Sequence, residues 1–170
     1  MSGRATRFAR IGVVVVRIAI ASLLVIAGAA KLYGAWKGAP AERTILADFT
    51  GGSGTRMAAL GAAELAVGMW LASGRKPAGA ALIGLAMFST FIGVLAVELR
   101  RPTPRACGCL AGLLDGATAT GSEQIVGELQ TAVARNFAAG IGCMGLYFMQ
   151  GRKSARRGAP AISPPTPVAT

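Results

Sequence analysis

The fold is decided by a stretch that runs from Pro77 to Leu99 and reads PAGAALIGLAMFSTFIGVLAVEL. Glu98 is its only charged residue. A helix needs about 20 mostly apolar residues to cross a bilayer core that is about 30 Å thick. Three further stretches approach or meet that length, namely Ile11–Leu32, Met57–Ser73 and Thr131–Gln150. The sequence therefore predicts an all-α fold, an integral membrane four-helix bundle.

The composition agrees with a chain that is surrounded by lipid. Of the 170 residues, 53% are hydrophobic and 15% are charged, whereas a soluble domain usually has about 25% charged residues. The 24 glycines fit this fold, because small residues let membrane helices approach one another closely. The net charge is +11, but the basic residues flank the apolar stretches and do not gather with stacking aromatics on one surface. We therefore expect membrane lipid as a partner and no nucleic acid.

The basic residues also predict an orientation, because the cytoplasmic ends of membrane helices carry an excess of Lys and Arg. One side has nine of them, namely Arg4, Arg7, Arg10, Arg75, Lys76, Arg152, Lys153, Arg156 and Arg157. The other side has six, namely Lys37, Arg43, Arg56, Arg100, Arg101 and Arg105. We expect both termini in the cytoplasm and the loop Arg100–Gln130 on the extracytoplasmic side, where disulfides persist.

Three regions follow from this distribution. Residues 1–10 form a basic cytoplasmic lead, and residues 11–150 form the transmembrane domain. Residues 151–170 are basic and then rich in proline, so they cannot bury enough apolar surface to fold, and we expect a disordered cytoplasmic tail. Ser122–Leu129 has the pattern of an amphipathic helix. We expect this short helix to lie on the extracytoplasmic membrane surface before the fourth span.

The first apolar stretch has a second interpretation. A basic start followed by Ala27-Gly28-Ala29 resembles a secretory signal with its small-residue cleavage site. However, Arg17 interrupts the apolar region, and Ile11–Leu32 is longer than the usual apolar core of a signal, which has about 7–15 residues. We therefore expect an uncleaved first helix.

The most distinctive local motif is Cys107-Gly108-Cys109 in the third loop. Two thiols separated by one glycine can close a strained disulfide, and strained, exposed disulfides tend to be the labile and catalytic ones. Gly108 supplies the backbone freedom that such a ring needs. Arg105 lies just upstream, and positive charge near a thiol raises the fraction present as thiolate. A static disulfide, or two unrelated loop residues, remain the alternatives. Cys143 lies in the fourth apolar stretch, where we expect it to pack as a small apolar side chain.

Glu64 lies near the middle of the second apolar stretch, where an unpaired charge costs about 2.5–3.5 kcal/mol on insertion scales. Gly61 and Gly68 share its helix face by their spacing, so another helix can approach this face closely. We expect a partner for the carboxylate across the bundle, and the candidates are Lys31, Arg17, Arg135 and Asn136. A structural ion pair and a proton-relay or ligand role both stay open. Glu98 and Arg135 lie near helix ends and are expected to reach the membrane interface.

The chain contains no histidine. This composition removes histidine-based catalysis and most zinc sites, and we expect no metal.

Four motifs stand in order along the chain, namely Gly28-Ala29-Ala30-Lys31-Leu32, Ala63-Glu64-Leu65-Ala66-Val67-Gly68, Cys107-Gly108-Cys109 and Arg135-Asn136. Together they resemble the MauE branch of the DoxX-like family of four-helix membrane proteins, from Val13 to Phe148. The resemblance implies a multi-pass protein of the bacterial inner membrane that is associated with thiol redox processes. In this family, MauE is linked to the maturation of methylamine dehydrogenase, whose small subunit is rich in disulfides.

The resemblance further implies that Cys107 and Cys109 exchange with an extracytoplasmic redox protein or with a maturing substrate protein. The chain would then be a thiol-disulfide oxidoreductase or an accessory subunit of one. Similarity of relatives to the vitamin K epoxide reductase type of bundle implies a quinone as the candidate cofactor. The chain departs from the family pattern at Leu110-Ala111-Gly112, where members commonly have Phe-Gly, and it lacks a second cysteine pair.

Two other functions remain open. The chain can be a non-catalytic assembly or scaffold subunit with a static cysteine pair. It can also be a small transporter with Glu64 as coupling site, although four helices without a visible repeat disfavour this.

Overall fold

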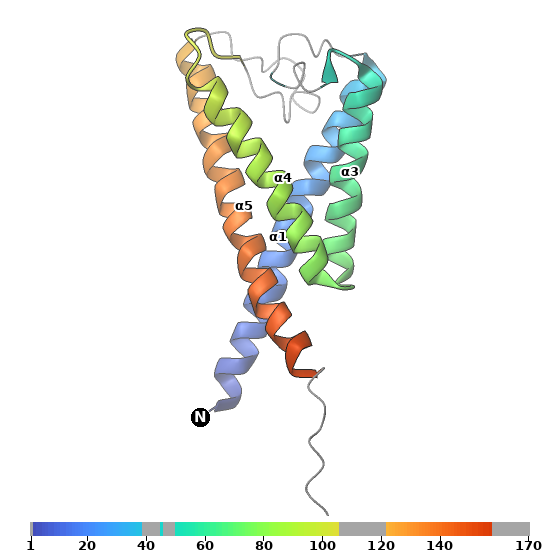
Figure 1. Ribbon diagram of the computed structural model, residues 1–170, viewed down its shortest axis with the longest axis vertical. Coiled ribbons are helices and arrows are strands. Elements are labelled where there is room, and N and C mark those ends of the chain that lie inside the picture. Colours follow the sequence, from blue (N-terminus) through green and yellow to red (C-terminus); the bar gives the residue numbers. More distant parts are fainter. Residues whose placement is uncertain (1, 39–44, 46–49, 106–121, 158–170) are drawn as a thin grey trace, which may run out of the picture.

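The computed structural model describes residues 2–38, 45, 50–105 and 122–157, and over these residues the fold is all-α (Figure 1). The helices are α1 (Ser2–Lys37), α3 (Gly54–Ser73), α4 (Pro77–Glu98) and α5 (Ser122–Arg157). No strand occurs in the described ranges. The predicted helical class is therefore confirmed, and each of the predicted apolar stretches lies in one helix.

Two of these helices are long and apolar enough to cross a membrane, namely Ile11–Lys37 within α1 and Pro77–Glu98 of α4. Only 22% of the most apolar window of α1 and 28% of that of α4 is buried inside the protein. A core helix of a soluble protein would be mostly buried, so these side chains instead face the surroundings. Among the described residues, α3 and α5 are less apolar than these two helices, and their crossing of the membrane stays a prediction.

The helices pack as two pairs, α1 with α3 and α4 with α5 (Figure 1). The two pairs meet near the turn between α3 and α4 and diverge toward the opposite end of the molecule. The turn is tight, because Gly74 and Lys76 both have positive φ, at 68° and 44°, and Pro77 begins the next helix. This turn joins α3 and α4 in a hairpin, but each of the two helices packs mainly on a helix outside the hairpin.

Glycines set the close approach of α1 to α3. A Cβ atom on Gly28 would lie 2.5 Å from the carbonyl oxygen of Gly61, and one on Gly61 would lie 2.7 Å from the carbonyl oxygen of Gly28. One on Gly68 would lie 3.0 Å from the carbonyl oxygen of Ala21. The backbones of α1 and α3 are thus in contact at Gly28 and Gly61, where neither residue has a side chain. This is the face that the spacing of Gly61, Glu64 and Gly68 predicted.

The main core lies where all four helices come together. Its buried members are Ile20, Ala21, Leu24, Val67, Leu71, Ala80, Ala81, Phe88, Ala139, Cys143 and Leu146. Cleavage of the first helix behind Ala29 would remove Ile20, Ala21 and Leu24 from this core. That the first helix is not cleaved stays a prediction.

The separate surface helix predicted at Ser122–Leu129 is wrong, because these residues are the first turns of one continuous α5. The physical reason is that the buried face already includes Leu129 and continues at the same spacing through Ala132 and Asn136. No proline interrupts Ser122–Arg157, so nothing ends the helix between the two segments. The helix also continues to Arg157, into the predicted tail, and residues 158–170 lie outside the described residues.

Candidate functional site

The first polar site is a buried ion pair between α1 and α3. The Nζ atom of Lys31 donates to both carboxylate oxygens of Glu64, at 2.8 and 2.7 Å. The two side chains are 2% and 1% exposed, so neither charge is solvated by water. Because a buried charge is tolerated when it is paired and hydrogen-bonded, this geometry accounts for Glu64 in the middle of an apolar helix.

The ammonium group of Lys31 also lies near an aromatic ring of a third helix. The Nζ atom of Lys31 lies 5.7 Å from the centroid of the Phe91 ring on α4, which is within the range of a cation–π interaction. The neighbouring Gly28 and Gly61 bring α1 and α3 close enough for the short contacts. The lysine is thus held by a carboxylate on one helix and an aromatic ring on another.

The other candidate partners of Glu64 lie elsewhere. The guanidinium of Arg17 lies against the turn between α3 and α4, where its Nη1 atom would be 2.6 Å from a Cβ on Gly74. Asn136 is buried but donates from Nδ2 to the carbonyl oxygen of Ala132 on its own helix, at 2.9 Å. Arg135 has a buried Nε atom without a hydrogen-bond partner. Of the predicted partners, the structure brings only Lys31 to the carboxylate.

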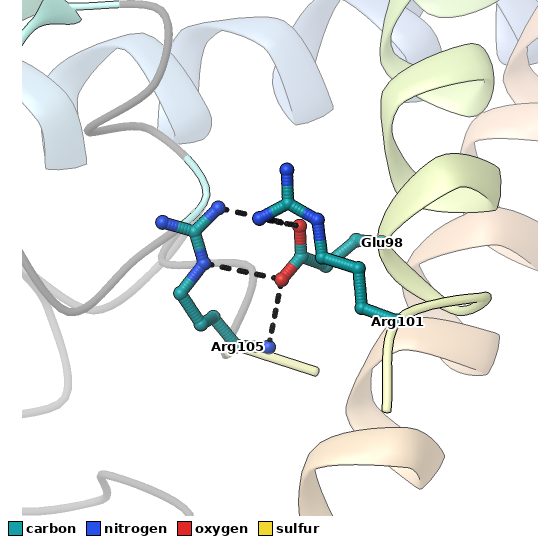
Figure 2. Close-up of polar contacts among 3 residues, drawn as sticks. All are labelled: Glu98, Arg101 and Arg105. Atoms are coloured by element: carbon teal, nitrogen blue, oxygen red, sulfur yellow. Dashed lines mark hydrogen bonds and ion pairs between the residues drawn. The ribbon is translucent and has the colours of Figure 1, made fainter. Parts of the chain in front are cut away.

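A second polar site lies at the end of α4, and sequence reasoning missed it. The Glu98 side chain is 2% exposed and lies between the guanidinium groups of Arg101 and Arg105 (Figure 2). Arg105 donates from Nε to Oε1 at 3.1 Å and from Nη2 to Oε2 at 3.3 Å. Its backbone N–H also donates to Oε1, at 3.0 Å. Nη1 of Arg101 lies 3.2 Å from Oε2. We refer to these three residues as the Glu98 cluster.

Glu98 thus binds two arginines of its own chain, and its expected position at the membrane interface stays a prediction. A carboxylate in the last turn of a helix is disfavoured by the partial negative charge of the free carbonyl groups there. Arg101 and Arg105 offset this unfavourable interaction, because their guanidinium groups bind the Glu98 carboxylate. The signal in the sequence was the placement of Arg101 and Arg105 three and seven residues after Glu98.

The backbone between these residues has little freedom. The N–H of Leu99 donates to Leu95 and that of Arg101 donates to Glu98, both at 3.0 Å, so helical turns continue past the last residue of α4. Pro102 and Pro104 follow and fix their own φ angles, and each also restricts the residue before it. The chain therefore returns to Glu98 at Arg105 through a short and stiff loop.

The predicted redox motif, Cys107-Gly108-Cys109, lies outside the described residues. In the sequence, Cys107 follows Arg105 by two residues, so the motif begins close to the Glu98 cluster along the chain. The expected effect of the Arg105 charge on the thiols stays a prediction, and the guanidinium of Arg105 binds Glu98. Arg105 is thus part of the Glu98 cluster and is the last residue before the motif that the structure describes.

Cys143 is a free cysteine that is 0% exposed in the main core. A Cβ on Gly84 of α4 would lie 3.2 Å from its sulfur, so the thiol fills the space left by that glycine. The prediction of an apolar packing role is confirmed. Within the described ranges, no group of three or more Cys, Asp or Glu side chains could hold a metal ion.

Comparison with known proteins gives one match. The family described as Methylamine utilisation protein MauE matches residues 9–148. No curated protein and no solved structure matches the chain. The matched range begins in α1, ends in α5, and includes the ion pair, the Glu98 cluster and the cysteine motif.

Proposed function

Because the chain belongs to the MauE family of methylamine utilisation proteins, we propose that it is a multi-pass membrane protein that exchanges disulfides with an extracytoplasmic protein. The exchanging groups are the thiols of Cys107 and Cys109. The observation that carries the proposal is the position of this motif, which begins two residues after Arg105, where the chain is fixed to the end of α4. A thiol pair that leaves a membrane domain from a fixed point is suited to meeting a partner outside the membrane.

The proposed reaction is a balanced exchange between two cysteine pairs. A thiolate of one protein attacks a sulfur of the other protein's disulfide, and a mixed disulfide forms as the first sulfur–sulfur bond breaks. The second thiolate then resolves the mixed disulfide. Two electrons and two protons pass in total, so that one pair becomes a disulfide as the other becomes a dithiol. The partner is either a redox protein or a maturing substrate protein.

The distribution of aromatic and basic side chains supports a membrane position for the bundle. At one end of α1, Lys37 lies over the rings of Trp36 and Tyr33, at 5.6 and 5.7 Å, and Trp36 is 79% exposed. At the turn between α3 and α4, Trp70 donates from Nε1 to the carbonyl oxygen of Arg75, and the guanidinium of Arg17 lies against the same turn. Trp and Tyr are enriched at both membrane interfaces.

The distance between these two levels fits a bilayer. Arg17 and Trp36 are both in α1, and their separation corresponds to about 28 Å at about 1.5 Å per residue, close to the thickness of the hydrocarbon core. Large apolar side chains are also exposed on α3 and α5, among them Met69, Phe137, Ile141, Met144 and Phe148. Exposed apolar surface on all four helices favours a bundle that crosses the membrane four times. The excess of Lys and Arg beside the termini and the second turn supports a cytoplasmic position of both termini, and the family resemblance implies a bacterial inner membrane.

The ion pair between α1 and α3 offers no place for the quinone that the family resemblance implied as cofactor. Among the buried side chains of the described residues the only cation is Lys31, and both carboxylate oxygens of Glu64 bind it. No free buried donor is therefore available at this site to hold a quinone oxygen, and no step of the proposed exchange uses one. The same saturation of Glu64 disfavours the transporter alternative.

The test is the redox state of the cysteines in intact cells. Free thiols are tagged with a maleimide of known mass, with and without prior reduction. We expect a shift of two tags on reduction in the parent chain and in the matched control Cys143→Ser. We expect Cys109→Ser to trap a partner as a mixed disulfide that reductant releases.

Two outcomes would favour the scaffold alternative. One is a pair of thiols that is always free. The other is a disulfide that resists mild reductant, together with full biological activity of the Cys107→Ser/Cys109→Ser variant.

A further inference from the structure

We propose that the turn between α3 and α4 binds the headgroup of an anionic phospholipid, with Arg17, Arg75 and Lys76 as its basic contacts. The turn lies at the end of the bundle that is remote from the start of α5 (Figure 1). Such a lipid site is independent of the cysteine motif and of the exchange reaction proposed above. The position of the three cations, the location of the carboxylates and the apolar side chains around the turn support it.

The three cations come from two separate parts of the chain and meet at this turn. The guanidinium of Arg17 in α1 lies over Gly74, where the lack of a side chain makes room for it, and Nη1 would be 2.6 Å from a Cβ atom there. Arg75 and Lys76 follow Gly74 directly, and both are exposed. The carbonyl oxygen of Arg75 accepts a hydrogen bond from Nε1 of Trp70 at 2.7 Å, which restrains the backbone of the turn. The cations are therefore held close together on an ordered turn.

The carboxylates of the protein lie away from these cations. All seven acidic residues of the chain fall between Glu42 and Glu128, and none falls between positions 65 and 97. The nearest one along α3 is Glu64, which lies about three helical turns before the turn and binds Lys31. No ion pair joins Arg17 to a carboxylate within the described ranges, and its buried Nε atom has no hydrogen-bond partner. An anion from outside the chain is thus needed to balance the charge at the turn.

Apolar side chains around the turn favour an amphiphilic anion over a free one. Met69 of α3 and Leu82 of α4 are exposed within two helical turns of the cations. Along α1, Ile11 and Val15 are exposed on the N-terminal side of Arg17. A phospholipid suits this arrangement, because its phosphate binds the cations while its acyl chains cover the apolar side chains beside them. A headgroup with a net negative charge is favoured further, since a zwitterionic headgroup brings a cation of its own.

Tryptophan fluorescence can measure this binding, because Trp70 is part of the turn and the chain has only one other tryptophan, Trp36. The full chain is prepared with Trp36→Phe, so that Trp70 is the only reporter. It is reconstituted into vesicles of phosphatidylglycerol and phosphatidylcholine, in which either the first or the second lipid has brominated acyl chains. Bromine quenches tryptophan at close contact, so the two quenching values give the relative affinity of the turn for the two lipids.

We expect Trp70 to report a preference for phosphatidylglycerol of at least roughly fivefold, which corresponds to about 1 kcal/mol for one basic residue near an anionic headgroup. The variant Arg75→Gln/Lys76→Asn should reduce this preference. Asparagine tolerates the positive φ of 44° at position 76, so the turn keeps its conformation. The matched control is Lys37→Gln/Arg100→Gln, which removes two exposed charges at the opposite end and should leave the preference unchanged.

Salt separates a site from diffuse attraction between the lipid surface and a basic protein. In 1 M sodium chloride the Debye length is about 3 Å, so attraction over longer distances is screened, whereas direct contacts are screened less. We therefore expect a preference for phosphatidylglycerol to remain at Trp70 under these conditions. Arg17→Gln should abolish what remains, because it removes the cation that lies over the turn.

Four outcomes would overturn the proposal. These are equal quenching by the two lipids, a preference that disappears in 1 M sodium chloride, an equal loss of preference in the control variant, and loss of the preference on addition of millimolar inorganic phosphate. The last outcome would assign the turn to a free anion. If the double variant at the turn is not recovered folded, Arg75→Gln alone gives the same comparison, because its side chain is exposed.

Discussion

The buried pair of Lys31 and Glu64 gives a prediction whose magnitude follows from its geometry. In Glu64→Gln, the ammonium of Lys31 stays at a site that is 2% exposed without a counter-ion. Removal of one partner of a buried pair typically costs about 3–5 kcal/mol, and a charge at the centre of a membrane helix costs about 2.5–3.5 kcal/mol on insertion scales. The Phe91 ring lies near the ammonium in the parent chain as well, so it does not change the difference between parent and variant. We therefore expect a loss of about 3–5 kcal/mol for Glu64→Gln.

The matched variant is the double change Glu64→Gln/Lys31→Met. Methionine has a similar length and carries no charge, so no buried cation is left, and we expect a free energy of unfolding within about 1 kcal/mol of the parent chain. The assay is reversible unfolding of the purified protein in mixed micelles with increasing sodium dodecyl sulfate, read by circular dichroism. The quantity of interest is the coupling energy between the two positions.

Additivity of the two single changes would refute the reasoning. If Glu64→Gln and Lys31→Met each cost little and their sum equals the double variant, the charges do not stabilise one another. Rescue of stability by the double variant without rescue of biological activity would instead mean that Glu64 also has a functional role.

Three further predictions concern packing, the turn and orientation. Gly28→Ala should lower the free energy of unfolding by about 1–3 kcal/mol, because its Cβ would lie 2.5 Å from the Gly61 carbonyl oxygen. In the control variant Gly93→Ala the new Cβ meets nothing within 4 Å, so this variant should be neutral or stabilising. Thermal denaturation in detergent measures both variants. Gly74→Ala should cost about 1–2 kcal/mol because φ is 68°, and equal melting temperatures would contradict this. An export-dependent reporter fused after Gly112 should be active, and activity only after Gln150 would reverse the proposed orientation.

The sequence predicted what depends on composition and spacing along single helices. The apolar stretches located the helices, and the spacing of Gly61, Glu64 and Gly68 identified the face of α3 that packs on another helix. The sequence alone could not predict that Lys31, and not Arg17, pairs with Glu64. Both residues are in α1, and only the register of α1 against α3 decides which of them faces Glu64. That register is set by the contact of Gly28 with Gly61, which is a property of the packed structure.

The Glu98 cluster was missed for a different reason. Helix periodicity describes side chains within a helix, whereas Arg105 reaches Glu98 only because the chain folds back after α4 has ended. A loop that returns on itself has no period to detect. Similarly, the amphipathic pattern of Ser122–Leu129 was identified correctly as helical, but its continuity with the following span depended on the packing of Leu129 against α4 in the tertiary structure.

The pairing of α1 with α3 has a consequence for the order of events during synthesis. Lys31 and Glu64 are 33 residues apart in the chain, so the lysine leaves the ribosome first. At about 5–20 residues per second, its carboxylate follows about 2–7 s later. During this interval α1 has an ammonium group without its counter-ion, so its insertion to the final depth costs more before α3 arrives. The Phe91 ring of α4 reaches the ammonium later still, so the ion pair of the first two helices can form while the second pair is being translated.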